Sequence, residues 1–131
     1  MKFARWTFLV AGIWGIAILT PHYFFEKQIG INHPPAITHP EFFYGFVGVA
    51  LAWQILFLII ANDPIRYRMA MLAGVLEKFS FAVAVYALYA AERVSLPMVI
   101  GGSVDAVLGI LFLFAFFKTR SPEGRHIEAA Q

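Results

Sequence analysis

Four stretches of this sequence are long and apolar enough to cross a lipid bilayer, at about residues 4–22, 42–61, 68–91 and 95–117. A bilayer-spanning helix needs about 20 mostly apolar residues. Within hydrocarbon every backbone N–H and C=O group must be paired inside the protein, so each stretch is expected to be an α-helix. The sequence therefore predicts an all-α fold, a polytopic transmembrane four-helix bundle spanning residues 1–118, followed by a polar cytoplasmic tail at 119–131.

Composition supports a membrane protein and excludes several other classes. Hydrophobic residues make up 60% of the 131-residue chain and charged residues 14%, and the mean hydropathy is +0.72, which leaves too little polar surface for a water-soluble globule of this size. No cysteine is present, so disulfides and thiol chemistry are excluded. The basic residues lie at the ends of apolar stretches, which is typical of topology signals and not of nucleic-acid binding. The first stretch is expected to be a retained helix and not a cleaved signal peptide.

The distribution of Lys and Arg predicts the orientation of the bundle. Cytoplasmic ends of membrane helices carry an excess of these residues. An up-and-down, antiparallel arrangement places Lys27 and Arg93 on one side of the membrane. The opposite side receives a larger basic set: Lys2, Arg5, Arg66, Arg68, Lys118, Arg120 and Arg125. We therefore expect both termini to be cytoplasmic.

The connections between the predicted spans differ in length. A short turn around Pro64 follows the second span, and Ser95 is expected to cap the fourth span with Pro97 in its first turn. These short turns predict that spans two, three and four form consecutive hairpins. The first connection, residues 23–41, is long and rich in aromatic residues, Pro and His, and a loop of that length in a small protein is more often functional than idle.

Three ionisable residues lie in the middle of the third and fourth spans. Glu77 and Lys78 are adjacent in the third span, and Asp105 is in the fourth. Charged groups at bilayer depth cost roughly 2.5 to 3.5 kcal/mol each, so they are seldom kept without a partner or a function. On a helical wheel Glu77 falls on a stripe of small residues, which is expected to be the packing face of the third helix: Ala70, Ala73, Gly74, Ser80, Ala84, Ala87 and Ala91.

Asp105 is flanked in the same way by Gly101 and Gly109, at positions i−4 and i+4. Lys78 lies at the border of the small-residue stripe, and Gln54 of the second span, beside Trp53, is the remaining polar side chain near this depth. We therefore expect Gln54, Glu77, Lys78 and Asp105 to form one polar cluster.

The charge balance of this cluster leaves its role open. Two carboxylates and one ammonium carry a net charge of minus one, so either a carboxyl is protonated or another cation is present. One alternative is a structural salt bridge between helices. The others are functional: a ligand cavity with a polar end, a catalytic acid/base pair formed by Glu77 and Asp105, or a proton or ion pathway.

The long first connection carries a second candidate site. Imidazole and carboxylate groups that would gather at the non-cytoplasmic surface are candidate metal ligands: His22, Glu26, His33, His39 and Glu41. No His-Glu-x-x-His pattern is present, and capping explains part of the set equally well, because Glu41 complements the positive N-terminus of the following helix.

The layout of the chain resembles the DoxX-like group of small bacterial membrane proteins. The resemblance is carried by four spans in a short chain, Arg5 at the start of the first, Gly45 and Gly48 in the second, and the turn from Asp63-Pro64 to Arg68. It implies a bacterial inner-membrane location and an accessory or quinone-proximal role, because the group includes subunits of quinone-linked oxidoreductases. By analogy of sites alone, Glu77, Asp105, Trp53 and Tyr86 are similar to the residue inventory of the sterol-isomerase-like EXPERA proteins.

Together these observations favour an accessory or ligand-binding membrane protein. The expected ligand is a lipid, a sterol-like molecule or a quinone, held near Trp53, Gln54, Lys78 and Tyr86. The alternatives are an isomerase-like enzyme acting on a lipophilic substrate and a proton or ion pathway. Besides the bilayer, the expected partners are a second copy or a larger membrane complex, since Gly12 with Gly15 and Gly45 with Gly48 could face a neighbour within the chain or another protomer. The sequence names no cofactor.

Overall fold

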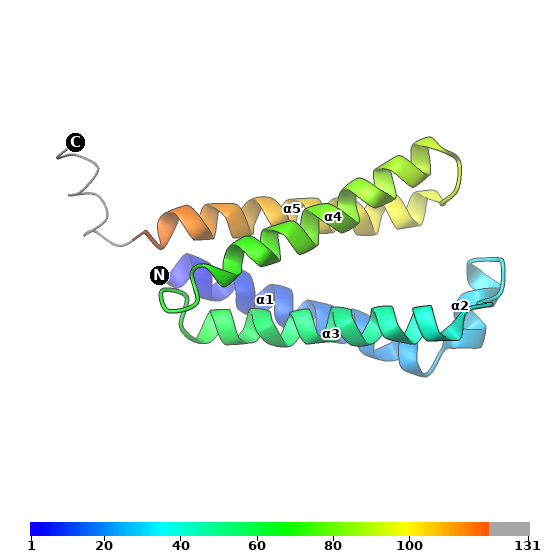
Figure 1. Cartoon of the computed structure of the whole chain (residues 1–131), viewed down its shortest axis with the longest axis horizontal. Coiled ribbons are helices and arrows are strands. Elements are labelled where there is room, and N and C mark those ends of the chain that lie inside the picture. Colours follow the sequence, from blue (N-terminus) through cyan, green and yellow to red (C-terminus); the bar gives the residue numbers. More distant parts are fainter. Residues whose placement is uncertain (121–131) are drawn as a thin grey trace.

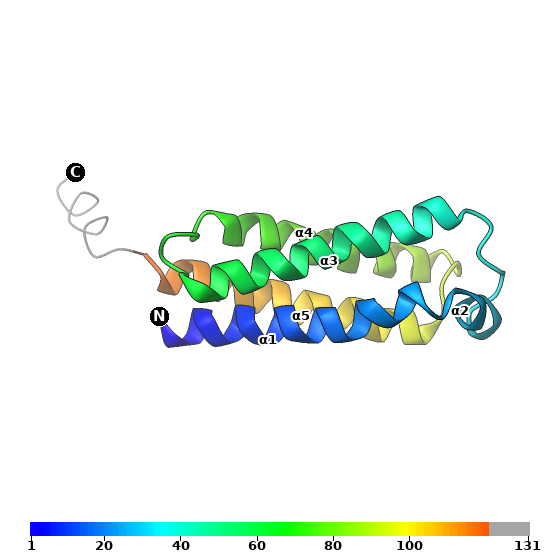
Figure 2. The ribbon, with the colours of Figure 1, turned by 90° about the horizontal axis from the view of Figure 1, so that it is seen from below.

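The computed structural model describes residues 1–120, and every regular element in that range is helical. The elements are α1 (Lys2–Leu19), η1 (Thr20–Tyr23), α2 (Glu26–Asn32), α3 (Pro40–Asn62), α4 (Ala70–Ala90) and α5 (Leu96–Lys118). Figure 1 shows the four long helices lying lengthwise, and Figure 2 shows the short α2 crosswise at the end away from the chain termini.

The predicted all-helical architecture is confirmed for the described residues. Four helical segments are long and apolar enough to cross a membrane: Lys2–Tyr23, Pro40–Asn62, Ala70–Ala90 and Leu96–Lys118. Their ends lie within a few residues of the predicted ones, and the first span includes η1. Of the predicted tail at 119–131, the structure describes residues 119 and 120, and Thr119 is buried. The rest of the tail lies outside the described residues.

Local sequence explains where the helices begin and end. Proline lies in the first turn of both α3 and α5, where its missing N–H has no intrahelical partner to lose. Ser95 is the N-cap of α5, as predicted, but its side chain makes no capping hydrogen bond. In the turn after α3, the backbone N–H of Arg66 donates to Asp63 Oδ1 at 3.1 Å, which fixes the reversal of the chain.

The four long helices form two close pairs. α1 packs along α3, and α4 packs along α5, whereas α3 and α4 have few contacts despite their short connection. Figure 1 shows the two pairs meeting at the end that carries the termini and diverging toward the other end. Spans two and three are joined by the predicted short turn, but α3 and α4 pack little against each other. A short turn fixes only the ends that it joins, and it does not keep two helices together over their full length.

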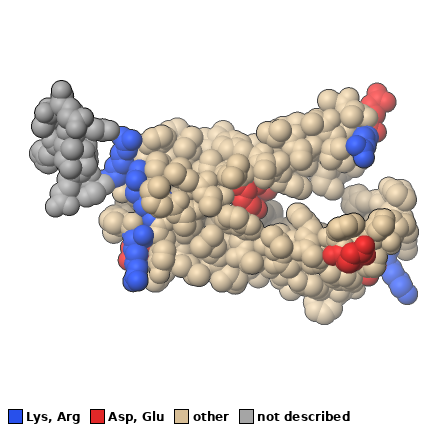
Figure 3. All heavy atoms as spheres, in the orientation of Figure 1, with Lys and Arg blue, Asp and Glu red and all other residues tan. Residues whose placement is uncertain are grey.

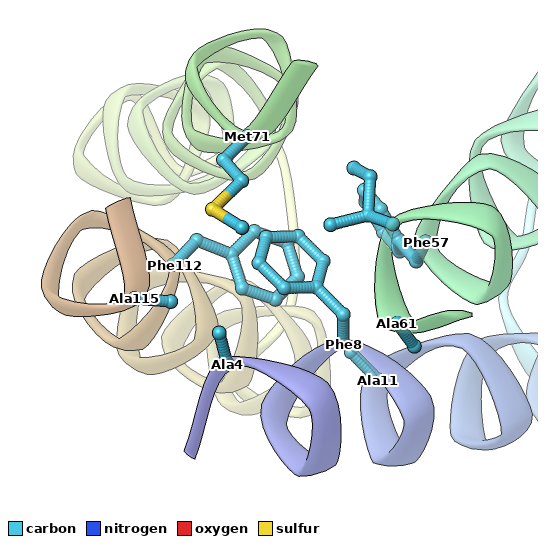
Figure 4. Packing of buried hydrophobic residues seen from close by; sticks show 9 residues of the cluster. Ala4, Phe8, Ala11, Phe57, Ala61, Met71, Phe112 and Ala115 are labelled. Carbon is cyan, nitrogen blue, oxygen red and sulfur yellow. The ribbon is translucent and has the colours of Figure 1, made fainter. Parts of the chain in front are cut away.

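A compact aromatic core joins the two pairs at the end that carries the termini. Phe8, Phe57 and Phe112 come from three different helices and are fully buried. The rings of Phe8 and Phe112 stack with their centroids 4.0 Å apart, and Phe57 meets Phe112 edge-on at 4.9 Å. Figure 4 shows Met71 of α4 closing the cluster. Among the described residues no comparable buried core lies at the other end, where Phe46 of α3 and Phe81 of α4 meet with their ring centroids 6.4 Å apart.

Hydrogen bonds from two arginine side chains to backbone carbonyl groups reinforce this closed end. The guanidinium of Arg5 donates to the carbonyl of Asn62 at 3.2 Å, and that of Arg68 donates to the carbonyl of Phe116 at 3.1 Å. Asn62 and Phe116 lie in the last turns of α3 and α5, where carbonyl groups lack intrahelical donors. Arg5 therefore links α1 to the end of α3, and Arg68 links the α3–α4 connection to the end of α5.

The packing face of α4 differs from the predicted one. Its buried residues are Met71, Gly74, Lys78, Ala82 and Val85, whereas most of the predicted stripe is exposed, namely Ala73, Ser80, Ala84, Ala87 and Ala91. The cause lies in α5, whose glycines accept large side chains from α4. A Cβ atom at Gly102 would lie 3.0 Å from Val85, and one at Gly109 would lie 3.1 Å from Phe79. The glycines of α5 therefore receive Val85 and Phe79, and the face of α4 that packs is the one with these larger side chains as well as Gly74 and Ala82.

The glycines of α1 and α3 face the chain itself in three of the four cases left open by the sequence. A Cβ at Gly12 would clash with Leu58, and one at Gly15 would clash with the side chain of Gln54, so both glycines allow close α1–α3 packing. A Cβ atom at Gly48 would lie 3.3 Å from the hydroxyl oxygen of Tyr23. Gly45 has no neighbour within 4 Å.

The C-terminal end of α4 offers a direct test of the backbone geometry. Glu92 adopts a left-handed conformation with φ of 57°, which costs an L-residue about 1 kcal/mol and costs glycine little. We expect Glu92→Gly to raise the free energy of unfolding in detergent by about 1 kcal/mol, measured by SDS titration. Ala91→Gly is the matched control, since Ala91 has φ of −87° and gains nothing from glycine. Equal effects of the two substitutions on the free energy of unfolding would contradict the left-handed conformation of Glu92.

Candidate functional site

Lys78 is held between two carboxylates at the middle of the bundle. Its Nζ lies 3.1 Å from Oδ1 of Asp105, to which it donates a hydrogen bond, and 3.4 Å from Oε2 of Glu77. The Glu77 contact is an ion pair without hydrogen-bond geometry, so Oε2 has no hydrogen-bonding partner. The structure therefore brings together the three predicted charges, and Lys78 pairs with both acids.

The burial of these three groups is the reverse of the predicted order. The sequence pattern placed Glu77 on the packing face and Lys78 at its edge, but Lys78 is the buried residue, with 7% of its side chain exposed. The side chains of Glu77 and Asp105 are 18% and 20% exposed. The ammonium lies 5.4 Å from the centroid of the Phe57 ring, on the side of the aromatic core. Lys78 is therefore the most enclosed of the three side chains, and Glu77 and Asp105 are each partly exposed.

Gln54 joins the same region from α3. Its side chain is almost fully buried and packs on Gly15 of α1. The Nε2 group donates to the carbonyl of Ala50 at 3.0 Å, and Oε1 has no partner. This assignment of the amide is fixed by Ala50, because a carbonyl oxygen can only accept. A buried acceptor without a donor costs about 1 to 3 kcal/mol, so Gln54 is a costly feature of this wall.

A cavity of about 720 Å³ separates the two helix pairs. Its wall includes Glu77, Lys78 and Asp105, together with Trp53 and Gln54. Figure 3 shows the acidic atoms at the middle of the molecule, where the hollow between the pairs begins. The volume falls within the range of roughly 300 to 1,000 Å³ that is usual for small-molecule sites. The polar cluster therefore forms one end of a ligand-sized space.

Most of the cavity wall is apolar and aromatic. Besides Trp53, the aromatic lining residues are Trp14, Phe46 and Phe81, each from a helix that faces the gap. Sequence reasoning missed these three residues. Their position depends on the divergence of the helix pairs, which no local pattern in the sequence reveals. An apolar wall ending on a few polar groups is the usual form of a site for a lipophilic molecule.

Tyr86 does not belong to the cavity. Its hydroxyl is hydrogen-bonded to Ser103 Oγ at 2.8 Å, and the side chain is absent from the cavity wall. It lies two turns beyond Lys78 on α4 and ties α4 to α5. The structure therefore does not bring Tyr86 to the polar cluster. The aromatic residues that line the cavity besides Trp53 are Trp14, Phe46 and Phe81, which the sequence pattern did not single out.

The candidate metal ligands of the first connection are not gathered at one point. Within residues 1–120, no group of three His, Cys, Asp or Glu side chains is placed to hold a metal ion. Glu26 accepts a hydrogen bond from the Tyr44 hydroxyl at 2.6 Å, and His39 lies 3.3 Å from Glu41 near the start of α3. His33 follows α2 and is exposed. These side chains are spread along the surface and do not form a metal-binding group in the described part of the chain.

His22 has a different position from the others, since it lines the cavity. Its Nδ1 lies 3.0 Å from the carbonyl of Ile18 and must donate to it. In the neutral ring Nε2 is then an acceptor. His22 therefore adds a polar group to the cavity wall away from the charged cluster, near the wider end of the gap.

Comparison with protein-family models, with curated proteins and with solved structures finds no match for this chain. The resemblance to the DoxX-like group stays a prediction. Function is therefore argued from the geometry of the cavity and its polar end.

The pairing of Lys78 can be measured by a double-mutant cycle in detergent. We expect Asp105→Ala to lower the free energy of unfolding by about 2 kcal/mol, less than the roughly 3 to 5 kcal/mol for a buried pair, because Glu77 still faces Lys78. Lys78→Ala/Asp105→Ala is expected to recover about 1 kcal/mol of the summed single losses. The same cycle with exposed Glu41 in place of Asp105 is the control and should be additive. Additivity in both cycles would refute the Lys78–Asp105 ion pair.

Proposed function

We propose that this chain is an integral membrane protein that binds a lipophilic molecule between its two helix pairs, as an accessory or ligand-binding component of the membrane. The observation that carries the proposal is the 720 Å³ cavity, with apolar walls and one polar end. In a bilayer the gap between α3 and α4 faces the acyl chains, so a lipid, a sterol-like molecule or a quinone could reach the cavity sideways without crossing water.

The proposed topology is an up-and-down, antiparallel bundle with both termini in the cytoplasm. Basic residues at the closed end support this orientation, since Lys2, Arg5 and Lys118 gather there with Arg66 and Arg68 (Figure 3). The opposite end carries Lys27 and Arg93. The cavity then opens in the non-cytoplasmic half of the membrane. A bacterial inner membrane is proposed from the resemblance to the DoxX-like group.

A second candidate is acid/base catalysis on a lipophilic substrate. It requires carboxyl groups that a ligand can reach, and Glu77 and Asp105 both line the cavity. Glu77 is the better candidate for proton exchange, because Asp105 is occupied by a hydrogen bond from Lys78. Binding is the common requirement of both functions, so the binding site is tested first.

A proton or ion pathway is less well supported. Such a pathway needs polar groups or water on both sides of the cluster. On the side of the closed end the cluster meets Phe57, and beyond it Phe8 and Phe112 fill the space with fully buried rings. The described residues offer no polar route through this core.

Two glycine substitutions provide a matched test of the cavity. Gly101 lines the cavity and Gly45 does not, and an added Cβ meets nothing within 4 Å at either position. We expect Gly101→Leu to fill the cavity and remove a lipophilic molecule that co-purifies with the wild-type chain, detected by native mass spectrometry. Gly45→Leu should retain it. Equal retention of bound molecules by both variants would contradict the proposed site.

A further inference from the structure

We propose that the cavity selects a cationic amphiphile, a lipophilic molecule whose head is an ammonium group that donates hydrogen bonds. This inference rests on the proposed function and names the class of ligand that the same site takes. It follows from which atoms of the polar cluster face the cavity, from the charge of the cluster, and from the unsatisfied amide of Gln54.

The first observation is the order of burial in the cluster. Lys78 is the most enclosed of the three side chains, with 7% of it exposed, compared with 18% for Glu77 and 20% for Asp105. All three residues line the cavity. Glu77 and Asp105 therefore expose more of their side chains at this end of the cavity than Lys78 does, and carboxylate oxygens accept hydrogen bonds when ionised. A head that offers only acceptors, such as a carboxylate or phosphate, would face repulsion there.

The second observation is the charge balance. With all three side chains ionised the cluster carries minus one, and no other Lys or Arg lines the cavity among the described residues. An unbalanced charge at bilayer depth is expensive. The ammonium of a ligand supplies the missing positive charge and makes the set neutral. This corresponds to the second of the two alternatives left open by the sequence, a further cation instead of a protonated carboxyl.

The third observation is independent of the acids. Gln54 is 2% exposed and lines the cavity, and its Oε1 is a buried acceptor without a donor. Its Nε2 donates one of its two hydrogens to the carbonyl of Ala50, so the unsatisfied atom of this amide is its oxygen, which is an acceptor. The carbonyl dipole adds negative potential at the same end of the cavity. The wall therefore favours a donor from the α3 side as well as from α4 and α5.

The remaining polar groups of the wall agree with this reading. The hydroxyl of Ser80 donates to the carbonyl of Glu77 at 2.9 Å, which leaves its lone pairs as acceptors. His22 donates its Nδ1 hydrogen to Ile18, which leaves Nε2 as an acceptor in the neutral ring. The accessible polar atoms of the wall are thus mainly acceptors, while the apolar remainder suits an alkyl chain or a ring system.

The test compares three matched probes in phosphatidylcholine nanodiscs that hold the full-length protein. The probes are a long-chain primary amine, an alcohol and a carboxylate of equal chain length, each with a bromine atom at the chain end that quenches tryptophan fluorescence. Trp14 and Trp53 line the cavity, whereas Trp6 does not, so Trp6→Phe serves as the background. We expect saturable quenching by the amine at concentrations about tenfold or more below those needed for the other two probes.

Three variants separate the inference from the proposed function. Glu77→Gln and Asp105→Asn should each weaken binding of the amine by about tenfold, while Glu92→Gln, outside the cavity, should leave it unchanged. Gly101→Leu should abolish saturable quenching. If the alcohol or the carboxylate binds as well as the amine, and Gly101→Leu blocks it, the inference is overturned and the proposed function stands.

If no probe shows saturable quenching that Gly101→Leu removes, the proposed function fails and the inference fails with it. If a charge-neutralising variant does not fold, as judged by circular dichroism and elution profile, the ranking of the three probes on the Trp6→Phe chain decides the matter alone. A ranking with the amine first supports the inference, and any other ranking overturns it.

Discussion

The ion contacts of Lys78 are the constraint on which the middle of this bundle depends. An ammonium at bilayer depth needs an anionic partner, and the nearest one, Asp105, is supplied by a different helix at 3.1 Å. Close approach of α5 requires a residue without a side chain beside the Lys78 stem, and Gly109 fulfils that role. Once Lys78 faces α5, its neighbours Gly74 and Ala82 are buried with it, and Ala73, Ala84 and Ala87 are turned outward. One ion pair thus sets the rotation of α4 about its axis.

The aromatic core determines what the other half of the molecule can be. Phe8, Phe57 and Phe112 bind the two helix pairs together at the end that carries the termini. Among the described residues no buried core like that of Phe8, Phe57 and Phe112 joins the pairs at the far end. The pairs therefore diverge and leave a cavity that begins at the charged cluster. The charges are therefore both a structural link and part of an accessible wall. One cluster thus combines two features: Lys78 links α4 to α5 through Asp105, and Glu77 and Asp105 line the cavity.

Sequence reasoning succeeded where a strong physical constraint acts within one segment. Span length and the need to pair backbone groups in hydrocarbon predicted the four helices to within a few residues. Depth along a helix predicted that Lys78 and Asp105 meet. Sequence reasoning failed where the outcome depends on which helices pack against each other. The stripe through Ala73 and Ala84 was assigned to packing, but the glycines of α5 receive the larger side chains of the opposite face. Trp14 and Phe81 were missed for the same reason, since a cavity between diverging pairs has no sequence signature.

The most direct test of the central claim is a density map of the full-length protein in nanodiscs, determined with a rigid binding fragment attached outside the membrane. The claim is that the two helix pairs diverge around a lipophilic ligand whose polar end meets the carboxylates of Glu77 and Asp105. The predicted result is elongated density between α1–α3 and α4–α5 that ends within hydrogen-bonding distance of one of these carboxylates. Helix pairs packed against each other along their full length, with both carboxylates sealed between them, would contradict it.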